Sequence, residues 1–242
     1  MITGAAGGIG RALVSRFSAD GFRVIALDHA ARPAEFPGVE YLRVDLQAMV
    51  VDPEYANGVL SALEALIGDG GLSLLVNNAA VQILGGVDTL SVHDWHRTLD
   101  VNVVAPFVLT QGLLPQLEAA QGCVVNISSI HARQTKANFL AYATSKAALS
   151  GMTRAMAVDL GGRVRVNAIE PAAIATDMLK AGFAAQPEGY ASLESCHPQG
   201  RIGTPEEVAA LVRAVSDGEL RFLHGACIGI DGGISSRLHD PV

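Results

Sequence analysis

The chain has 242 residues, of which 50% are hydrophobic and 17% are charged, and its formal net charge is −7. This acidic balance provides no basic surface for nucleic acid or anionic lipid, so small-molecule chemistry is the better expectation. The length predicts one domain over residues 1–242, and the three cysteines are too dispersed to predict a disulfide framework or a zinc site.

Short apolar runs alternate along the chain with longer segments of helical periodicity. Most of the runs are continuously apolar, which is typical of parallel strands covered by helices on both faces. The alternation predicts an α/β fold with a doubly wound sheet. The predicted strands are residues 23–27, 39–44, 72–76, 123–127, 164–169 and 227–230, and the predicted helices are 9–19, 53–67, 91–119, 139–160 and 205–216.

Three segments depart from a regular alternation. Only Met1 and Ile2 precede the first glycine-rich turn, so the first strand is unusually short, and we expect that upstream residues are missing from this sequence. Pro33 and Pro37 disfavour a crossover helix within residues 29–38. Residues 170–204 are too long for a routine connection, and we predict a substrate lid at about 177–203.

The glycine-rich turn at residues 3–10 lies between the strand remnant and the first helix. Backbone N–H groups of Gly4, Gly8, Ile9 and Gly10, together with the helix N-terminus, would hold a pyrophosphate, although a tight turn without a ligand is the alternative. Asp28 follows the next strand and could accept hydrogen bonds from both ribose hydroxyls of an adenosine. Its charge would repel a 2′-phosphate, so NAD is the predicted cofactor.

Tyr142 and Lys146 are four residues apart within a predicted helix, so their side chains share one face. A tyrosine phenol is normally too weak a base at neutral pH, and a neighbouring ammonium favours the phenolate. An exposed helix pair without catalytic duty is the alternative. Ser129 and its neighbour Ser128 end a predicted strand, where a hydroxyl could stabilise a substrate oxygen or satisfy local backbone.

These motifs resemble those of the short-chain dehydrogenase/reductase family, in its single-domain branch of about 250 residues. The likeness extends along nearly the whole chain, and its segments follow the order of the family. They are Thr-Gly-x-x-x-Gly-Ile-Gly at 3–10, Asp45-Leu46 after Val44, Asn-Asn-Ala-Ala at 77–80, Asp94-Trp95 through Val103, Asn-Ile-Ser-Ser at 126–129, Tyr-Ala-Thr-Ser-Lys at 142–146, Arg-Val-Asn at 165–167, Pro171, Thr-Asp-Met at 176–178 and Asp-Gly-Gly at 231–233.

The resemblance implies a Rossmann-type sheet with strand order 3-2-1-4-5-6-7 and hydride transfer between NAD(H) and a secondary alcohol or ketone. Tyr142 would be the general acid/base, Ser129 would steady the substrate oxygen, and Lys146 would assist Tyr142 and bind the nicotinamide ribose. Asn102 would hold a water that links Lys146 to solvent. The remaining residues implied to contact the cofactor are Asp45, Leu46, Asn78 and Ala79 at the adenosine end, and Pro171, Ile174 and Thr176 beside the nicotinamide.

Ala80 and Ala172 stand where the family usually has glycine, so a positive φ at either position would be strained.

Several alternatives stay open at the level of sequence. Because Arg32 lies near Asp28 in the sequence, an NADPH-dependent carbonyl reductase is one alternative. Because the first strand is short, a non-catalytic dinucleotide-sensing protein is another. Candidates for the substrate pocket are Gln82, His131, Arg133, Asn138 and lid residues 178–197, and His131 and Arg133 could bind a carboxylate or phosphate.

We also expect a cytoplasmic protein without a membrane segment, because no signal core or long apolar run occurs. By resemblance, it would form a homotetramer or dimer.

Overall fold

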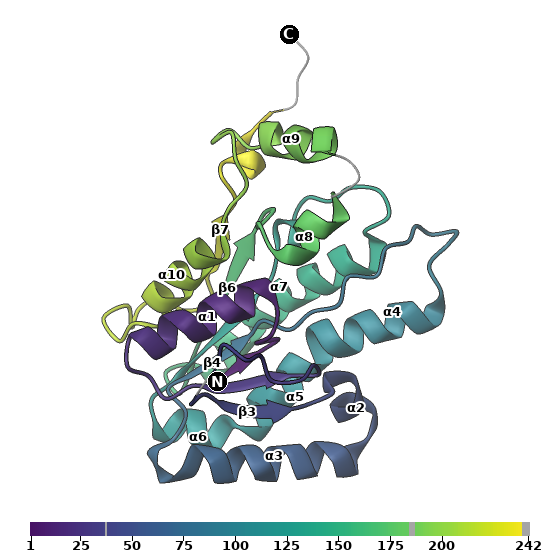
Figure 1. Ribbon diagram of the computed structural model, residues 1–242. Coiled ribbons are helices and arrows are strands. Elements are labelled where there is room, and N and C mark those ends of the chain that lie inside the picture. The colour runs from purple at the N-terminus through teal and green to yellow at the C-terminus, as the bar shows by residue number, and fades with distance from the viewer. Residues whose placement is uncertain (37, 184–186, 239–242) are drawn as a thin grey trace.

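Seven strands form one parallel sheet in the computed structural model, which describes residues 1–36, 38–183 and 187–238. The strand order is β3-β2-β1-β4-β5-β6-β7, so the predicted fold and order are confirmed (Figure 1). The strands are β1 (Ile2–Thr3), β2 (Ile25–Asp28), β3 (Glu40–Arg43), β4 (Leu74–Asn77), β5 (Cys123–Ile127), β6 (Arg165–Pro171) and β7 (Cys227–Ile230).

Ten α-helices occur in the described part of the chain. They are α1 (Gly8–Ala19), α2 (Leu46–Val51), α3 (Pro53–Ile67), α4 (Val92–Leu99), α5 (Ala105–Gly112), α6 (Leu114–Ala119), α7 (Leu140–Leu160), α8 (Asp177–Gly182), α9 (Pro187–Cys196) and α10 (Pro205–Ser216). The strand order reverses between β1 and β4, and such a switch point is where open α/β sheets bind ligands.

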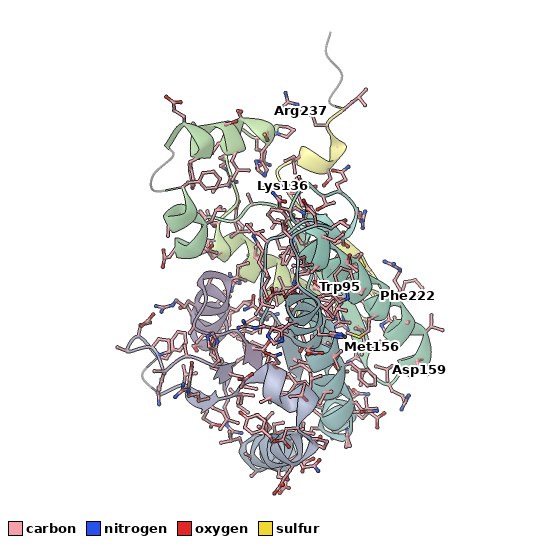
Figure 2. The ribbon with its side chains drawn as sticks, turned by 90° about the vertical axis from the view of Figure 1, so that its right-hand side faces the viewer. Trp95, Lys136, Met156, Asp159, Phe222 and Arg237 are labelled. Carbon is pink, nitrogen blue, oxygen red and sulfur yellow. The ribbon has the colours of Figure 1, made fainter. Side chains whose placement is uncertain are left out.

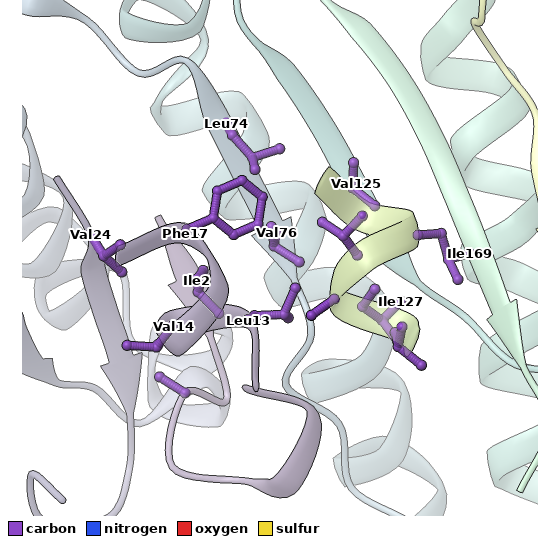
Figure 3. Close-up of a cluster of buried hydrophobic side chains, with 14 of the residues drawn as sticks. Ile2, Leu13, Val14, Phe17, Val24, Leu74, Val76, Val125, Ile127 and Ile169 are labelled. Atoms are coloured by element: carbon purple, nitrogen blue, oxygen red, sulfur yellow. The ribbon is translucent and has the colours of Figure 1, made fainter. Parts of the chain in front are cut away.

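Successive strand residues point to opposite faces of the sheet and build two hydrophobic layers. On one face, α1 and α10 cover Ile2, Val76 and Val125, and Phe17 of α1 packs among them (Figure 3). On the other face, Leu75 and Val124 pack beneath α3, α5 and α6. This two-sided burial explains why the strands read as continuously apolar.

The short central strand β1 is paired on both sides. Ile2 is in register with Ala26 of β2 and with Val76 of β4. The Met1 amine donates to the Leu74 carbonyl at 2.8 Å, and the Ala5 N–H donates to the Leu27 carbonyl at 3.1 Å. Hydrogen bonds therefore extend the ladders beyond the two residues of the strand.

The predicted helix 91–119 is wrong as one continuous element. It is divided into α4, the π-helical turn η2 (Asp100–Val104), α5 and α6. Pro106 and Pro115 lie in the first turns of α5 and α6, where the missing N–H is tolerated. The predicted lid contains α8 and α9, and both lie at one end of the molecule (Figure 1). Residues 184–186 of this lid lie outside the described residues.

None of the helices in the described part of the chain is both long and apolar enough to cross a membrane. That residues 1–242 form one dinucleotide-binding domain stays a prediction.

Candidate active site

The glycine loop after β1 is held by hydrogen bonds to the segment after β4. The Thr3 hydroxyl accepts from the N–H groups of Asn78 and Ala79, both at 3.0 Å. The Asn78 amide donates to the Thr3 and Gly4 carbonyls at 2.9 and 3.1 Å. Gly4 has φ +62°, and a Cβ there would lie 2.8 Å from the Ala79 Cα, so glycine is required. Asn78 and Ala79 thus shape the loop through these contacts.

The N-terminus of α1 is formed from the same loop. Gly8, Ile9 and Gly10 are the first helical residues, and N–H groups in a first turn have no partner within the helix. A Cβ on Gly10 would lie 2.0 Å from the Gly4 carbonyl oxygen, whereas one on Gly8 would lie 2.7 Å from the Thr176 Cγ2. The start of the lid therefore lies directly against the helix N-terminus, which is a favourable position for an anion.

Asp28 ends β2 and is buried, with 8% of its surface exposed. One carboxylate oxygen accepts from the Ala6 N–H at 2.9 Å, and the other accepts from the Ala30 N–H at 3.0 Å. A carboxylate offers about four lone-pair sites, so acceptor capacity is left for ribose hydroxyls. Arg32, the residue that kept NADP in view, instead donates to the Phe36 carbonyl.

Asp45 and Leu46 lie farther along the same edge. The Asp45 side chain caps α2 by accepting from the N–H groups of Gln47 and Ala48 at 2.9 and 3.1 Å. Leu46 begins that helix and packs partly buried against the hydrophobic layer beneath the sheet. The capping contact uses one oxygen of Asp45, so the predicted adenine contact stays a prediction.

Helix α7 brings Tyr142 and Lys146 together. The Lys146 Nζ lies 5.6 Å from the centre of the Tyr142 ring and donates to the Ile127 carbonyl at 2.8 Å. Lys146 is 2% exposed, and burial lowers its pKa to about 7. Burial raises the pKa of Tyr142, and a hydrogen bond with Ser129 opposes this rise.

The expected phenolate is therefore not favoured in the free protein. Burial outweighs the Ser129 contact at the phenol, and it also removes part of the positive charge from Lys146 at neutral pH.

The two adjacent serines have different surroundings. The Ser128 hydroxyl donates to the Lys146 carbonyl at 3.0 Å and lies 2.8 Å from the Ser150 hydroxyl, both within buried structure. The Ser129 hydroxyl accepts from the His131 N–H at 3.2 Å and lies against the Tyr142 phenol. Ser128 is thus committed to packing α7 on β5, and the geometry favours Ser129 for contact with a substrate.

Asn102 lies in the π-helical turn η2, with 1% of its surface exposed. Its side-chain oxygen accepts from the Val81 N–H at 2.8 Å. Its amide nitrogen donates to the Val81 carbonyl and to the Ser145 hydroxyl, both at 2.9 Å. The side chain therefore joins the loop after β4 to α7, and its predicted role as a water holder stays a prediction.

The segment after β6 approaches the glycine loop. Pro171 ends the strand, and Ile174 packs into the hydrophobic layer beside α1 and α10. Thr176 caps α8 by accepting from the Leu179 N–H at 3.3 Å. Neither Ala172 nor Ala80 has a positive φ, so the two departures from glycine impose no backbone strain.

Two predicted substrate-pocket residues differ in their availability. Arg133 forms an ion pair with Glu170, with 2.9 Å between Nε and Oε2, and is therefore already occupied. The His131 ring lies beside the Tyr142 ring, with 5.7 Å between centroids. Asn138 has φ +67°, and its carbonyl accepts from the Gly85 N–H, while Gln82 is exposed.

His197 is buried at the end of the lid, where its Nδ1 lies 2.9 Å from the Leu193 carbonyl oxygen.

Sequence reasoning missed a buried polar cluster between α7 and the ends of β5 and β6. Glu170 is only 3% exposed and accepts from the Ser150 hydroxyl at 2.8 Å, and Ser150 in turn meets Ser128. The only local signal was a carboxylate at the end of an otherwise apolar strand. Its partners come from β5, α7 and the segment before α7, which a local pattern cannot identify.

The residues at this edge fit a dinucleotide. The N–H groups in the first turn of α1, which have no partner within the helix, suit phosphates, and Asp28 suits a ribose. Gly4 and Gly8 let the loop pack closely against Ala79 and Thr176, where a Cβ would collide with neighbouring atoms. Tyr142, Ser129 and Lys146 follow at the carboxyl end of β5 and on α7, so this edge combines a nucleotide cradle with acid/base groups.

Comparison with known proteins gives matches along nearly the whole chain. A family model described as enoyl-(acyl carrier protein) reductase matches residues 4–235. The chain is 35% identical to protein FixR of Bradyrhizobium diazoefficiens, over 96% of this chain and 85% of that protein. It is 33% identical to D-threitol dehydrogenase of Mycolicibacterium smegmatis, over 98% and 92%. The solved structure of 4-hydroxyisoleucine dehydrogenase complexed with NADH is similar with a TM-score of 0.89 and 28% identity, over 98% of each chain.

Proposed function

Because the chain belongs to the short-chain dehydrogenase/reductase family, we propose that it interconverts a secondary alcohol and a ketone with NAD(H). The observation that carries this proposal is the convergence of Tyr142, Ser129 and Lys146 at the carboxyl end of β5 and on α7, at the same edge of the parallel sheet as the glycine loop after β1. The named activities of the D-threitol and 4-hydroxyisoleucine dehydrogenases support the same reaction class.

The residues proposed to hold the dinucleotide lie along the carboxyl edge of the sheet. Gly4, Gly8, Ile9 and Gly10 would bind the pyrophosphate, and Asp28 would bind the adenosine ribose. Asp45, Leu46, Asn78 and Ala79 would flank the adenosine half, and Pro171, Ile174 and Thr176 would flank the nicotinamide, with Tyr142 and Lys146 nearby. The bound dinucleotide supplies the hydride acceptor for oxidation and the hydride donor for reduction.

The protein's own side chains would manage the proton. In alcohol oxidation, Tyr142 takes the hydroxyl proton, and in ketone reduction it returns a proton to the same oxygen. Ser129 donates a hydrogen bond to that oxygen and stabilises the charge that develops there. Lys146, buried one helical turn below the phenol, would favour the phenolate whenever it is protonated.

A Tyr142→Phe variant tests the chemistry. It keeps the ring but removes the proton carrier, so turnover with secondary alcohols and NAD⁺ should fall by roughly 100-fold or more. Affinity for NADH should change little, because the phenol is not part of the phosphate or adenosine contacts. Tyr55→Phe is the control, since the one hydrogen bond of its hydroxyl with the described residues is accepted from the Asp45 N–H.

Unchanged turnover in Tyr142→Phe would eliminate the proposed mechanism. Measurable NADH binding without hydride transfer to any ketone in a broad panel would instead favour a non-catalytic dinucleotide-sensing protein. Tighter binding of NADPH than of NADH would identify an NADPH-dependent carbonyl reductase.

We propose in addition that the chain forms a homo-oligomer through two segments, η2 with Asn102 and the following helix α5, and α7 with Tyr142. Phe107 on α5 and Val158 on α7 are exposed apolar residues on these helices. Light scattering coupled to size exclusion tests this assembly, and a monomeric mass would rule it out.

A further inference from the structure

Arg133 is engaged by a buried carboxylate and by a backbone carbonyl. Its Nε lies 2.9 Å from a carboxylate oxygen of Glu170, whose side chain is 3% exposed, and its Nη2 donates to the Cys227 carbonyl at 3.2 Å. If Arg133 turned toward a substrate carboxylate, Glu170 would be left as a buried charge without its cation. The Arg133 side chain is 63% exposed, so solvent weakens the pair, but leaving the Glu170 carboxylate buried without a cation is unfavourable. This arginine therefore anchors the segment after Ser129 and leaves recognition to its neighbours.

His131 is the polar side chain of this segment that lies beside the reacting groups. Its ring stacks on Phe139 with 4.6 Å between centroids, and it meets the Tyr142 ring edge-on at 5.7 Å. Its backbone N–H donates to the Ser129 hydroxyl. The imidazole is thus held against the Tyr142 ring, and the backbone of the same residue is held against Ser129.

The imidazole has one ring nitrogen left for a ligand. Nδ1 lies 2.9 Å from the Thr135 hydroxyl, and Nε2 forms no hydrogen bond with any group in residues 1–36, 38–183 and 187–238. If Thr135 donates to Nδ1, Nε2 is a donor, and if Thr135 accepts, Nε2 is an acceptor. A hydroxyl group can both donate and accept, so it satisfies Nε2 in either tautomer. A carboxylate can only accept.

The His131 ring is uncharged at neutral pH, so it does not attract an anion. Burial, with a smaller contribution from Lys136, lowers the pKa of His131 to about 4. Lys136 is the nearby cation, with its Nζ 4.7 Å from the centre of the Phe139 ring. Figure 2 shows Lys136 at the same end of the molecule as Arg237, and Lys136 is exposed there to solvent that screens its charge.

We propose that His131 binds a second, uncharged oxygen of the substrate and so selects vicinal diols and their α-hydroxyketones. The His131 and Tyr142 rings are in edge contact, with 5.7 Å between centroids, so an oxygen on the carbon next to the reacting carbinol is the one within reach of His131. This inference rests on the proposed function. The second hydroxyl is bound but not oxidised, so Tyr142 and Ser129 act on the first hydroxyl as in any secondary alcohol. His131 is accordingly a specificity residue, and its removal should act on substrates that carry the second hydroxyl.

Three six-carbon alcohols provide a matched test: 3,4-hexanediol, 3-hexanol and 3-hydroxyhexanoate. We expect the wild type with NAD⁺ to oxidise the diol with the highest kcat/KM. His131→Leu should lower the ratio of kcat/KM for diol over monoalcohol by about tenfold, the effect of losing one neutral hydrogen bond. His131→Gln keeps an amide donor and acceptor and should retain part of the preference. His93→Leu, an exposed histidine on α4, is the control.

The ratio of kcat/KM for the diol over the monoalcohol distinguishes a loss of specificity from general damage to the site. A displaced Tyr142 would slow both alcohols, whereas loss of the second contact slows only the diol. A readout independent of turnover is the imidazole ¹⁵N spectrum of the NADH-bound protein, in which the diol should shift the His131 Nε2 resonance and 3-hexanol should not.

An unchanged ratio in His131→Leu, with 3-hexanol still oxidised, would overturn this inference alone. Preference for 3-hydroxyhexanoate that disappears in Lys136→Met would overturn it in favour of anion recognition. No oxidation of any alcohol by NAD⁺-saturated wild type would overturn the proposed function and this inference with it.

Discussion

Replacement of Lys146 by methionine should change how the stability of the protein depends on pH. Burial lowers the pKa of this lysine from 10.5 to about 7, and the side chain is 2% exposed. At about 1.4 kcal/mol per pKa unit, burial disfavours the ammonium by roughly 5 kcal/mol. Methionine fills a similar volume without a charge, so the variant removes this penalty.

The sign follows from proton binding. Below pH 7 both the folded and the unfolded chain hold the Lys146 proton, so this group does not make the free energy of unfolding depend on pH. Between pH 7 and 10.5 the unfolded chain holds the proton and the folded chain does not. The wild type should therefore gain stability as pH rises, by roughly 2 kcal/mol between pH 7 and 9, relative to Lys146→Met.

Urea unfolding of both proteins at pH 6, 7, 8 and 9, followed by Trp95 fluorescence at constant protein concentration and ionic strength, measures this difference. Loss of the hydrogen bond to the Ile127 carbonyl shifts the variant by a constant amount and leaves the slope unchanged. Lys136→Met, which changes an exposed lysine, should run parallel to the wild type. Parallel curves for Lys146→Met would refute the reasoning.

Two further predictions concern the cofactor. Asp28→Asn keeps the shape of the side chain but removes the charge that faces a 2′-phosphate, and this repulsion is worth roughly 3 kcal/mol. The affinity for NADPH should therefore rise by about 100-fold, while the affinity for NADH falls. Calorimetric titration with both nucleotides measures the two affinities, and equal changes for both would contradict the role of Asp28. Gly8→Ala places a Cβ 2.7 Å from the Thr176 Cγ2, so the same titration should show NADH binding weakened by roughly tenfold or more. Gly8→Ala/Thr176→Ser removes the colliding methyl group and should recover part of the affinity. Full affinity in the single variant would show that this contact is not part of the nucleotide site.

The strands and the long helices could be predicted because their signals are local. Strand β5 and helices α3 and α10 match their predicted bounds, and the last is fixed by Thr204, which forms a capping box with Glu207. Helix α2 was missed because it has only six residues and little periodicity. The signal for it was Asp45, an N-cap residue that the resemblance assigned to adenine instead.

Long-range contacts were beyond a reading of the sequence. Ser128 and Ser129 are adjacent and chemically identical, and only their contacts with α7 and with His131 distinguish them. The π-helical turn at Asn102 was likewise hidden, because its apolar spacing differs little from that of an α-helix.

The charge of the site is where residue types mislead most. From residue types alone, the site looks cationic, because it contains His131, Arg133 and Lys146. In the structure, Glu170 pairs with Arg133, and burial lowers the pKa values of His131 and Lys146, which favours their uncharged forms. Burial acts on Tyr142 in the same sense by favouring the neutral phenol. Arg133 is thus already paired, and burial favours the uncharged forms of His131, Lys146 and Tyr142, so these side chains offer hydrogen bonds rather than ion pairs to a ligand. Such a site suits an uncharged, hydroxyl-bearing substrate.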